Sequence, residues 1–246
     1  MATKERQSID FYETEANDYD KRRWNTEAGR YNDKIQKEIV IELVGDCEGK
    51  QILDIATGTG RFAMELAQRG AEMTVLDSSK NMLEVTHKKF EVLKLLEKLT
   101  IKQGLATKLP VSDKSLDICI CINAMNHIEG YSKVLLEIHR VLKPGGISVN
   151  SFTNWLSPYL PFGVWVNHKK KSVTRDVYTK WFNSIEIASL HKTCDLNVKA
   201  IRGELHFPTW GNNKGLLFFL KSFDRMLRKP PLGYFASQLF VKACKK

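Results

Sequence analysis

Apolar runs alternate with stretches of helical periodicity between residues 51 and 152. The runs are short and rich in Ile, Leu and Val, which is typical of strands buried on both faces of a parallel sheet. The stretches between them repeat apolar residues every three or four positions, as amphipathic helices do. The pattern predicts strands at 51–55, 72–76, 100–104, 116–122 and 146–152, and helices at 60–69, 79–97 and 131–142. Such alternation predicts an α/β fold built on a doubly wound, mostly parallel sheet.

Segments of different character flank this core. Residues 1–45 carry two helical patterns, a short one from about residue 9 and a longer one around residues 35–43. Residues 154–180 break the alternation with aromatic residues, Pro and Gly, so we interpret them as an insertion after the fifth strand. The chain then resumes with a predicted helix 181–194, strand 196–204, helix 213–228 and a final strand near 234–243. We therefore expect one domain, 1–246, with seven strands, in which 46–153 is the core and 181–246 completes the sheet.

The composition is that of an ordinary globular protein, with 43% hydrophobic and 27% charged residues in a chain of 246. The N-terminal sequence is polar, which argues against a signal peptide. The apolar run 215–220 is far shorter than the ~20 residues of a membrane span. We therefore expect a cytoplasmic protein. The five cysteines are scattered, and we interpret Cys119 and Cys121, two positions apart in a predicted strand, as core residues rather than metal ligands.

A net charge of +10 is the one unusual feature of the composition. Such a charge could attract RNA, an anionic membrane surface or an acidic substrate. The basic residues are spread along the chain, however, and do not interleave with aromatic residues as they do in an RNA-binding surface. We therefore expect a solvated basic surface and no stable nucleic-acid partner. A weak contact with an anionic membrane surface stays open, and so does the oligomeric state.

A glycine turn joins the first predicted strand to the helix that follows, at Gly58 and Gly60. Glycine lets the backbone approach a ligand closely, and the helix start offers free N–H groups, so the turn predicts a nucleotide site. Asp77 ends the next strand, where an acid can bind a ribose. Asp54, four residues before Gly58, would repel a pyrophosphate but attract an ammonium or sulfonium group. Together these features favour S-adenosylmethionine over a dinucleotide.

The same residues belong to a set of motifs in a fixed order. The motifs are Leu53–Gly60, Val75–Met82, Leu109–Pro110 before Ser115–Ile120, and Glu137–Gly146. In this order and spacing the chain resembles the class I S-adenosylmethionine-dependent methyltransferases from about residue 51 to 152. The segment Phe11–Asp20 is similar to the small-molecule branch of that family, which includes quinone-biosynthesis enzymes. The resemblance implies a Rossmann-like methyltransferase fold, a helical lid formed by residues 1–45, and a substrate-side position for the 154–180 insertion.

The resemblance also implies a reaction: transfer of a methyl group from S-adenosylmethionine to a small-molecule acceptor of phenolic, quinone-like or lipid-like character. The expected cofactor-binding residues are Asp54, Ala56, Thr57, Gly58, Gly60, Asp77, Ser78, Met82, Leu105, Ala106 and Asn123. Leu105 departs from the family, which usually places an acid there for the adenine amine. The backbone of Ala106 or the side chain of Thr107 could compensate for that lost partner.

Residues on the acceptor side are expected after the fourth strand and on the aromatic segments. Asn126 and His127 are the candidate catalytic residues, because the ordinary histidine pKa near ~6.5 suits a general base at neutral pH. The candidate substrate-binding residues are Tyr19, Trp24, Tyr31, Trp155, Tyr159 and Trp165. All of these side chains could instead serve packing alone, and the sequence leaves that alternative open.

Three other functions fit parts of the sequence. An NAD-linked oxidoreductase is disfavoured by Asp54 and by the lack of a Tyr-x-x-x-Lys pair. An RNA methyltransferase would explain the positive charge, but residues 123–126 lack the Asn/Asp-Pro-Pro-Tyr/Phe motif of such enzymes. A non-catalytic S-adenosylmethionine-binding module stays open because of the departure at Leu105. The acceptor and the attacked atom are not determined by the sequence.

Overall fold

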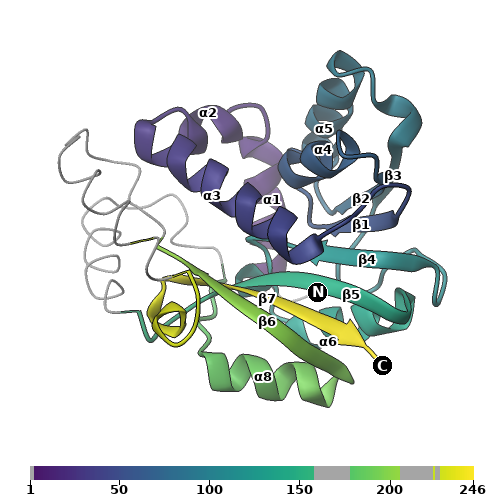
Figure 1. Ribbon diagram of the computed structural model, residues 1–246. Coiled ribbons are helices and arrows are strands. Elements are labelled where there is room, and N and C mark those ends of the chain that lie inside the picture. The colour runs from purple at the N-terminus through teal and green to yellow at the C-terminus, as the bar shows by residue number, and fades with distance from the viewer. Residues whose placement is uncertain (1–2, 158–177, 206–223, 225–227) are drawn as a thin grey trace.

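The computed structural model describes residues 3–157, 178–205, 224 and 228–246 (Figure 1). The helices are α1 (Thr3–Glu15), α2 (Tyr19–Trp24), α3 (Glu27–Val44), α4 (Arg61–Ala67), α5 (Lys80–Val92), α6 (Tyr131–Val141) and α8 (Ser184–Thr193). The strands are β1 (Gln51–Ile55), β2 (Glu72–Asp77), β3 (Leu99–Gln103), β4 (Leu116–Cys121), β5 (Leu142–Thr153), β6 (Leu196–Glu204) and β7 (Gln238–Lys245). Short 3-10 helices lie at η1 (Leu96–Lys98), η2 (Met125–His127) and η4 (Leu232–Phe235).

Within the described residues, seven strands form one sheet in the order β3-β2-β1-β4-β5-β7-β6. Strands β1 to β5 pair in parallel, whereas β7 runs antiparallel between β5 and β6. The predicted seven-stranded, mostly parallel α/β sheet is therefore confirmed. The strand order reverses between β1 and β4, and open sheets of this kind bind ligands beyond the carboxyl ends of the strands at such a reversal.

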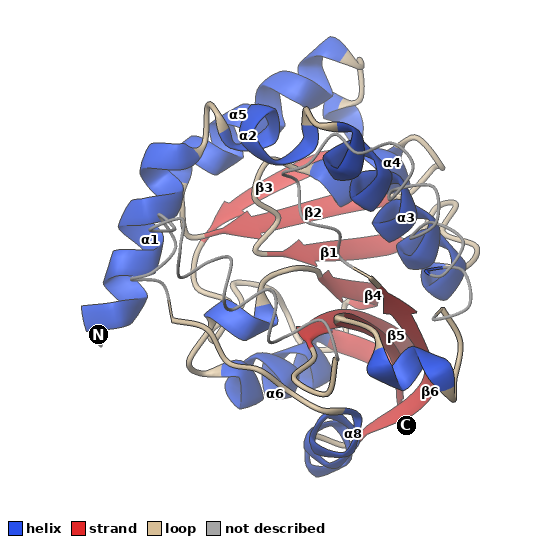
Figure 2. Cartoon of the chain, turned by 90° about the vertical axis from the view of Figure 1, so that its left-hand side faces the viewer, coloured by secondary structure: helices blue, strands red, loops and turns tan. Residues whose placement is uncertain are grey.

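Helices cover both faces of the sheet (Figures 1 and 2). On one face α3, α4 and α5 pack on the strands; α3 contributes Ile35, Ile39 and Leu43, at the spacing of one helical face. On the other face α6 and α8 pack against a second layer that includes Cys119 and Cys121. Both cysteines are fully buried, as expected of core residues. The two layers fix the strands, and thereby the loops at their carboxyl ends.

Some elements differ from their predicted bounds for local reasons. Helix α5 ends at Val92 because Lys94 adopts a left-handed φ of 56° and turns the chain out of the helix. Helix α8 begins at Ser184 because the side chain of Asn183 accepts a hydrogen bond from the Glu186 N–H and caps the helix. The predicted helix 213–228 and most of the 154–180 insertion lie outside the described residues.

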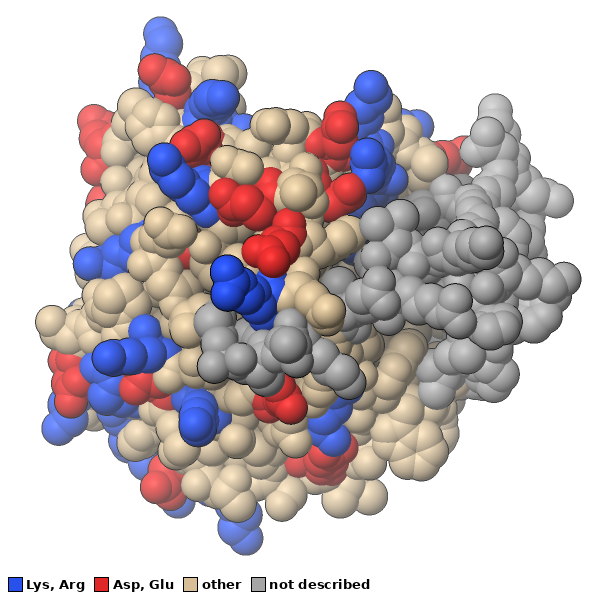
Figure 3. Space-filling view, turned by 180° about the vertical axis from the view of Figure 1, so that it is seen from behind, with Lys and Arg blue, Asp and Glu red and all other residues tan. Residues whose placement is uncertain are grey.

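The surface carries charge of both signs. On the face shown in Figure 3, Lys and Arg side chains are interspersed with Asp and Glu rather than gathered into one basic surface. None of the described helices combines the length and the apolar character that a membrane span requires.

Two glycines with nearly the same positive φ have different surroundings. Gly60, the N-cap of α4, has a φ of +74°, and a Cβ there would lie 2.6 Å from Cγ2 of Thr86 on α5. Gly145, in β5, has a φ of +77° and no atom within 4 Å of that position. Gly60 therefore lets α4 and α5 pack closely, in addition to permitting a left-handed turn.

Replacing these two glycines by Ala separates the two effects. Gly145→Ala should cost about 1–2 kcal/mol of folding free energy, the cost of a left-handed alanine. Gly60→Ala should cost about 1–3 kcal/mol more, because its methyl group also meets Thr86. Urea unfolding of both variants measures the difference, and equal losses would contradict the assigned contact.

Candidate functional site

A cavity lies at the carboxyl ends of β1, β2 and β4, where the strand order reverses. Its walls come from the turn after β1, the end of β2, residues 104–107 and residues 122–128. Helices α1 and α2 close its outer side; Figure 2 shows the arrowheads of β1, β2 and β3 directed toward α1. The predicted site residues that line it are Asp54, Ala56, Thr57, Gly58, Asp77, Ser78, Met82, Leu105, Ala106, Asn123, His127, Tyr19 and Trp24.

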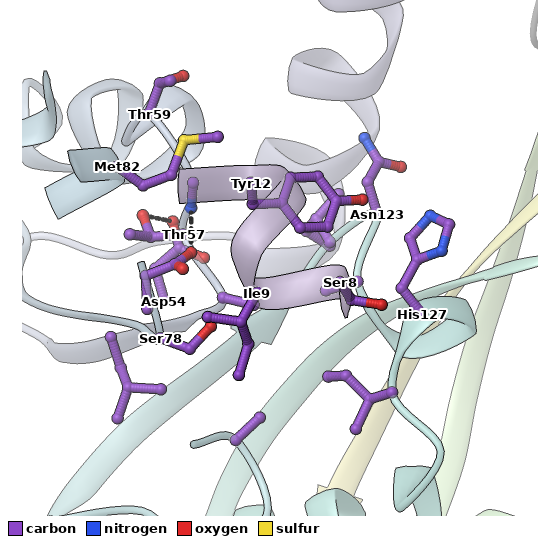
Figure 4. Close-up of a pocket in the computed structure, with 18 of the residues that line it drawn as sticks. Ser8, Ile9, Tyr12, Asp54, Thr57, Thr59, Ser78, Met82, Asn123 and His127 are labelled. Carbon is purple, nitrogen blue, oxygen red and sulfur yellow. Dashed lines mark hydrogen bonds between the residues drawn. The ribbon is translucent and has the colours of Figure 1, made fainter. Parts of the chain in front are cut away.

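Asp54 stands at the end of β1 and is only 2% exposed. Thr57 Oγ1 donates a 2.7 Å hydrogen bond to its Oδ2, and the Thr57 N–H donates to the Leu76 carbonyl at 3.0 Å, which ties the turn to β2 (Figure 4). Burial raises the pKa of Asp54 to about 7, against the opposing effect of the Thr57 bond. A positively charged ligand group beside Asp54 would favour its ionised form.

Asp77 ends β2 and holds the glycine turn in place. Its Oδ2 accepts a 2.8 Å bond from the Gly58 N–H, and its Oδ1 accepts a 2.9 Å bond from the Ser79 N–H. Burial raises its pKa, although these backbone bonds oppose that effect. The cap of α5 is Ser79, whose Oγ accepts from the Met82 N–H, so Asp77 is not needed for that role. A carboxylate offers about four acceptor positions, so each Asp77 oxygen can accept a further bond.

The two glycines of the turn play different parts. Gly58 has a φ of +56°, and no atom lies within 4 Å of the point that a Cβ would occupy, so its backbone is open to a close ligand. Gly60 is absent from the cavity lining, and its missing side chain makes room for Thr86 instead. We expected both to approach a ligand, but only Gly58 lies on the cavity wall.

An apolar wall of the cavity is formed by α5 and by the segment after β3. Met82 of α5 is almost fully buried, and Leu105 and Ala106 follow β3. At the position where related enzymes carry an acid, Leu105 therefore contributes a side chain without a hydrogen-bond acceptor. Thr107 also lines the cavity, in reach of the same region.

His127 lines the other end of the cavity, on η2. Its Nδ1 lies 3.0 Å from the Tyr178 carbonyl oxygen and its Nε2 lies 3.0 Å from Nδ2 of Asn126. Burial lowers the pKa of His127, so the neutral ring is favoured. A neutral ring between these partners donates from Nδ1 and accepts at Nε2. Asn126 is not on the cavity lining; its side-chain amide contacts the ring at Nε2 and orients it.

Asn123 lines the cavity with its side chain already engaged. Its Nδ2 donates to Gln36 at 3.0 Å, and its Oδ1 accepts from Gln238. Its φ of 60° is unusual for a residue other than Gly, and its N–H donates to Ser151 at 2.7 Å. The side chain thus fixes the loop after β4, which leaves the backbone carbonyl as the group able to bind an amino group.

The aromatic candidates divide into three groups. Tyr19 and Trp24 line the cavity. Tyr31 is directed elsewhere, because its hydroxyl donates a 3.0 Å bond to Asp224, and Trp155 is 48% exposed away from the lining. For Tyr31 and Trp155 the structure therefore gives no contact with the cavity. Tyr159 and Trp165 lie outside the described residues.

Comparison with known proteins agrees with this geometry. Residues 53–150 match the family described as "Methyltransferase domain". The resemblance to the class I methyltransferases is thereby confirmed for the core, and the structure shares the fold of a solved S-adenosylmethionine-dependent methyltransferase from Thermotoga maritima. That match has a TM-score of 0.71 at 21% identity and covers 96% of this chain and 99% of the other.

Curated relatives of the methyltransferase domain are similar over part of their length. A demethylmenaquinone methyltransferase from Chlorobaculum tepidum is 32% identical over 145 residues, 58% of this chain and 52% of the relative. A sterol 4-C-methyltransferase from Caenorhabditis elegans is 32% identical over 107 residues, 44% of this chain and 32% of the relative. The chain thus spans between a third and about half of the length of these two relatives.

Helices α1 and α2 add residues to the methyltransferase domain that sequence reasoning missed. Ser8, Ile9 and Tyr12 line the cavity from α1. Burial raises the pKa of Tyr12 well above its usual range, and its ring centroid lies 6.3 Å from that of His127. In Figure 4 the Tyr12 ring lies between the Asp54 side and His127. The helical spacing of Ile9 and Tyr12 predicted a helix, but not which end of the sheet it covers.

Polar contacts fasten these helices to the methyltransferase domain. Asn81 of α5 donates a 2.9 Å bond from its side chain to the Glu13 carbonyl of α1. Asp20 of α2 accepts from Thr59 Oγ1 at 2.7 Å and from Lys89 Nζ. The contacts of Asp20 reach the glycine turn and α5 together, so α2 is fixed against both.

Arg61 is a further residue that the motifs did not single out. It begins α4, lines the cavity, and donates 2.7 Å bonds to Asp33 and to Gln36 of α3. Its guanidinium carbon lies 4.0 Å from the ring centroid of Trp24 and 4.3 Å from that of Phe62. Its position directly after the glycine turn was the available signal, since that helix start faces any bound ligand.

Two buried acids make the stability of the protein depend on pH: Asp54, and Glu204 at the end of β6. Burial raises the pKa of Asp54 to about 7 and that of Glu204 to about 8, so the folded state keeps protons that the unfolded chain releases. Stability should therefore fall as the pH rises from ~4, the ordinary carboxyl pKa, to these values.

Urea unfolding between about pH 5 and pH 8 checks the contribution of each acid. In Asp54→Asn the free energy of unfolding should fall less steeply with rising pH below about pH 7. Above that pH its slope should stay as in the wild type, because Glu204 still titrates there. Glu204→Gln should remove the slope above about pH 7. A wild-type profile in Asp54→Asn would contradict the raised pKa.

Proposed function

We propose that this protein transfers a methyl group from S-adenosylmethionine to a carbon atom of an apolar, quinone-like or phenolic small molecule. One observation carries the proposal: a single cavity of a methyltransferase domain joins an open glycine turn, two buried acids and an apolar wall. When bound, S-adenosylmethionine would supply a methyl group on a positively charged sulfur. The residues present fit such a ligand part by part.

Asp54 suits the cationic amino-acid end of the cofactor. Its carboxyl group is buried and carries a raised pKa, so an ammonium or sulfonium nearby would stabilise its ionised form. A pyrophosphate in the same place would meet a buried acid with like charge, which is costly in a low-dielectric cavity. The electrostatics of the turn thus support an adenosyl amino acid over a dinucleotide.

Asp77 and the apolar wall suit the nucleoside end. The remaining acceptor positions of Asp77 can receive the two ribose hydroxyls as charge-assisted hydrogen bonds. Met82 and Leu105 offer apolar surfaces for a flat adenine ring, and the Ala106 N–H offers a donor for a ring nitrogen. Because Leu105 supplies no acceptor, the adenine amine would depend on Thr107 or on water.

The acceptor side combines aromatic surface with His127. Tyr12 and Tyr19 pack there, with ring centroids 6.4 Å apart, and offer an apolar surface to a flat acceptor. The names of two relatives support acceptors of this kind: one is a demethylmenaquinone methyltransferase and the other a sterol 4-C-methyltransferase. The second name specifies carbon, and a carbon atom that gains a methyl group must lose a proton.

We assign the removal of that proton to His127. Its neutral ring is favoured by burial, and its Nε2 is the nitrogen with a lone pair. Asn126 occupies that lone pair in the structure, so the acceptor must replace the Asn126 amide at Nε2 before proton transfer. Alignment of the acceptor with the methyl group supplies the rest of the rate.

Ligand binding tests the cofactor. Calorimetry should show binding of S-adenosylhomocysteine and none of NADH, because Asp54 opposes a pyrophosphate. Asp54→Asn should weaken S-adenosylhomocysteine binding by roughly tenfold, the effect of one charge-assisted hydrogen bond. Tighter binding of NADH than of S-adenosylhomocysteine would refute the proposed cofactor.

Turnover tests the base. With a demethylquinone acceptor, His127→Ala should lower kcat by about 10²–10³-fold, within the usual contribution of a general base. The affinity for S-adenosylhomocysteine should stay within about twofold of wild type, since His127 lies at the other end of the cavity. His87→Ala, at an exposed position of α5, is the matched control and should leave kcat unchanged. An unchanged kcat in His127→Ala at pH 7 would remove the base from the mechanism.

A further inference from the structure

The cavity wall after β3, residues 104–107, is almost free of hydrogen-bonding side chains. Leu105 and Ala106 are apolar, and the hydroxyl of Thr107 is the only side-chain donor or acceptor of the segment. Met82 of α5 adds a further apolar side chain to the cavity lining. A ligand group that needs a charged acceptor therefore finds none among the side chains of this segment.

Backbone contacts fix this wall next to Asp77. Strands β2 and β3 pair in parallel, with Asp77 opposite Gln103. The Gly104 N–H donates a 3.0 Å hydrogen bond to the Asp77 carbonyl, and the Lys108 N–H donates one of 3.0 Å to the Leu105 carbonyl, which closes a turn. Leu105 thus lies one strand beyond the acid assigned to the ribose, on a turn that is held at both ends.

The strand order sets which edge of the base meets Leu105. Strands β1, β2 and β3 are neighbours in that order, so the amino-acid end at Asp54, the ribose at Asp77 and the base after β3 follow one another along the edge of the sheet. A purine is joined to ribose through its five-membered ring, and the opposite edge, which carries the 6-amino group, points away from the sugar. That edge therefore faces the wall formed by residues 104–107.

We propose that Leu105 makes an apolar subsite for the 6-amino position, so that the protein binds adenosyl ligands alkylated on this amine as well as unmodified ones. The inference rests on the proposed function and extends it to a chemical class of ligand, the N6-alkyladenosine derivatives. A methyl group on the amine would leave water and contact the Leu105 side chain, while the remaining N–H can still donate to Thr107 or to water. A carboxylate in place of Leu105 would instead favour the unmodified amine, because a methyl group would displace its water without offering a hydrogen bond.

The position of the wall leaves space for such a group. Strand β3 is the edge strand of the sheet, and Gln103 and Lys108, on either side of residues 104–107, are exposed. The wall therefore lies at the protein surface rather than between packed layers. A segment in this position can adjust to an added methyl group at less cost than a close-packed core.

Two ligands and a set of matched variants test the subsite. The ligands are S-adenosylhomocysteine and its N6-methyl analogue, which differ by one methyl group on the purine amine. Leu105→Asp introduces a charged acceptor, and Leu105→Asn introduces an uncharged one of the same shape. Leu136→Asp, at a half-exposed position of α6 outside the cavity, is the control. Calorimetry on the full chain gives the affinity of each protein for both ligands.

In wild type and Leu136→Asp, the N6-methyl analogue should bind as tightly as S-adenosylhomocysteine or up to about fourfold more tightly, the effect of burying one methyl group. In Leu105→Asp the preference should reverse, with S-adenosylhomocysteine bound at least ~10-fold more tightly, the effect of a hydrogen bond to a charged group. Leu105→Asn should shift the preference in the same direction by a smaller factor. Binding of S-adenosylhomocysteine by the two Leu105 variants also shows that they are folded.

The outcomes separate the subsite from the cofactor. A wild type that binds S-adenosylhomocysteine more than about threefold more tightly than the analogue would overturn the subsite and leave the proposed cofactor in place. An unchanged preference in both Leu105 variants would overturn the assignment to Leu105. Failure of the wild type to bind either ligand would overturn the subsite together with the proposed function.

Discussion

The burial of two carboxyl groups at neighbouring strand ends is the constraint on which the site depends. Asp54 and Asp77 end β1 and β2, which pair in parallel, so the sheet itself brings the two acids to one edge. Each is held by local donors: Thr57 for the first, and the N–H groups of Gly58 and Ser79 for the second. Like charges buried so close destabilise one another unless a cation or a proton is present. The cavity is therefore built for a ligand that brings positive charge and hydroxyl groups.

The other walls of the cavity differ in chemical character from one end to the other. The apolar side chains after β3 and on α5 face one end, and His127 faces the other. Side-chain amides connect Gln36, Asn123 and Gln238, so α3, the loop after β4 and β7 meet in one hydrogen-bond network. Such a network keeps the loop that carries His127 in one conformation. The catalytic end is thus supported by elements far apart in the sequence.

The sequence predicted the fold well because the governing signals are local. Apolar runs, glycines and strand-end acids each act within a few residues, and they identified the strands and the turn from Asp54 to Gly60. Element ends were less accurate, since the left-handed Lys94 and the cap at Asn183 depend on single residues. The mostly parallel sheet agreed with expectation, because alternation of strands and helices along the chain favours parallel pairing.

The sequence predicted the site residues that directly follow a strand, but it did not tell which aromatic residues of the N-terminal helices reach the cavity. Tyr31 and Trp24 look alike in the sequence, as aromatic residues in a polar segment, yet one bonds to Asp224 and the other lines the cavity. Likewise, nothing in its spacing distinguishes Tyr12 from a core residue of an ordinary amphipathic helix. The positions of α1 and α2 depend on long-range polar contacts such as Asp20 with Thr59 and Lys89, which no local pattern encodes.

Those contacts of Asp20 have a mechanical consequence. The segment from Tyr12 to Trp24 touches both ends of the cavity, with Tyr12 beside His127 and Trp24 beside Arg61, and Asp20 anchors it between them. Thr59 thus joins the glycine turn to this segment by a direct hydrogen bond. Any coupling between a ligand beside Arg61 and the geometry beside His127 would pass through this short stretch of chain, and by thermodynamic reciprocity it would act equally in both directions.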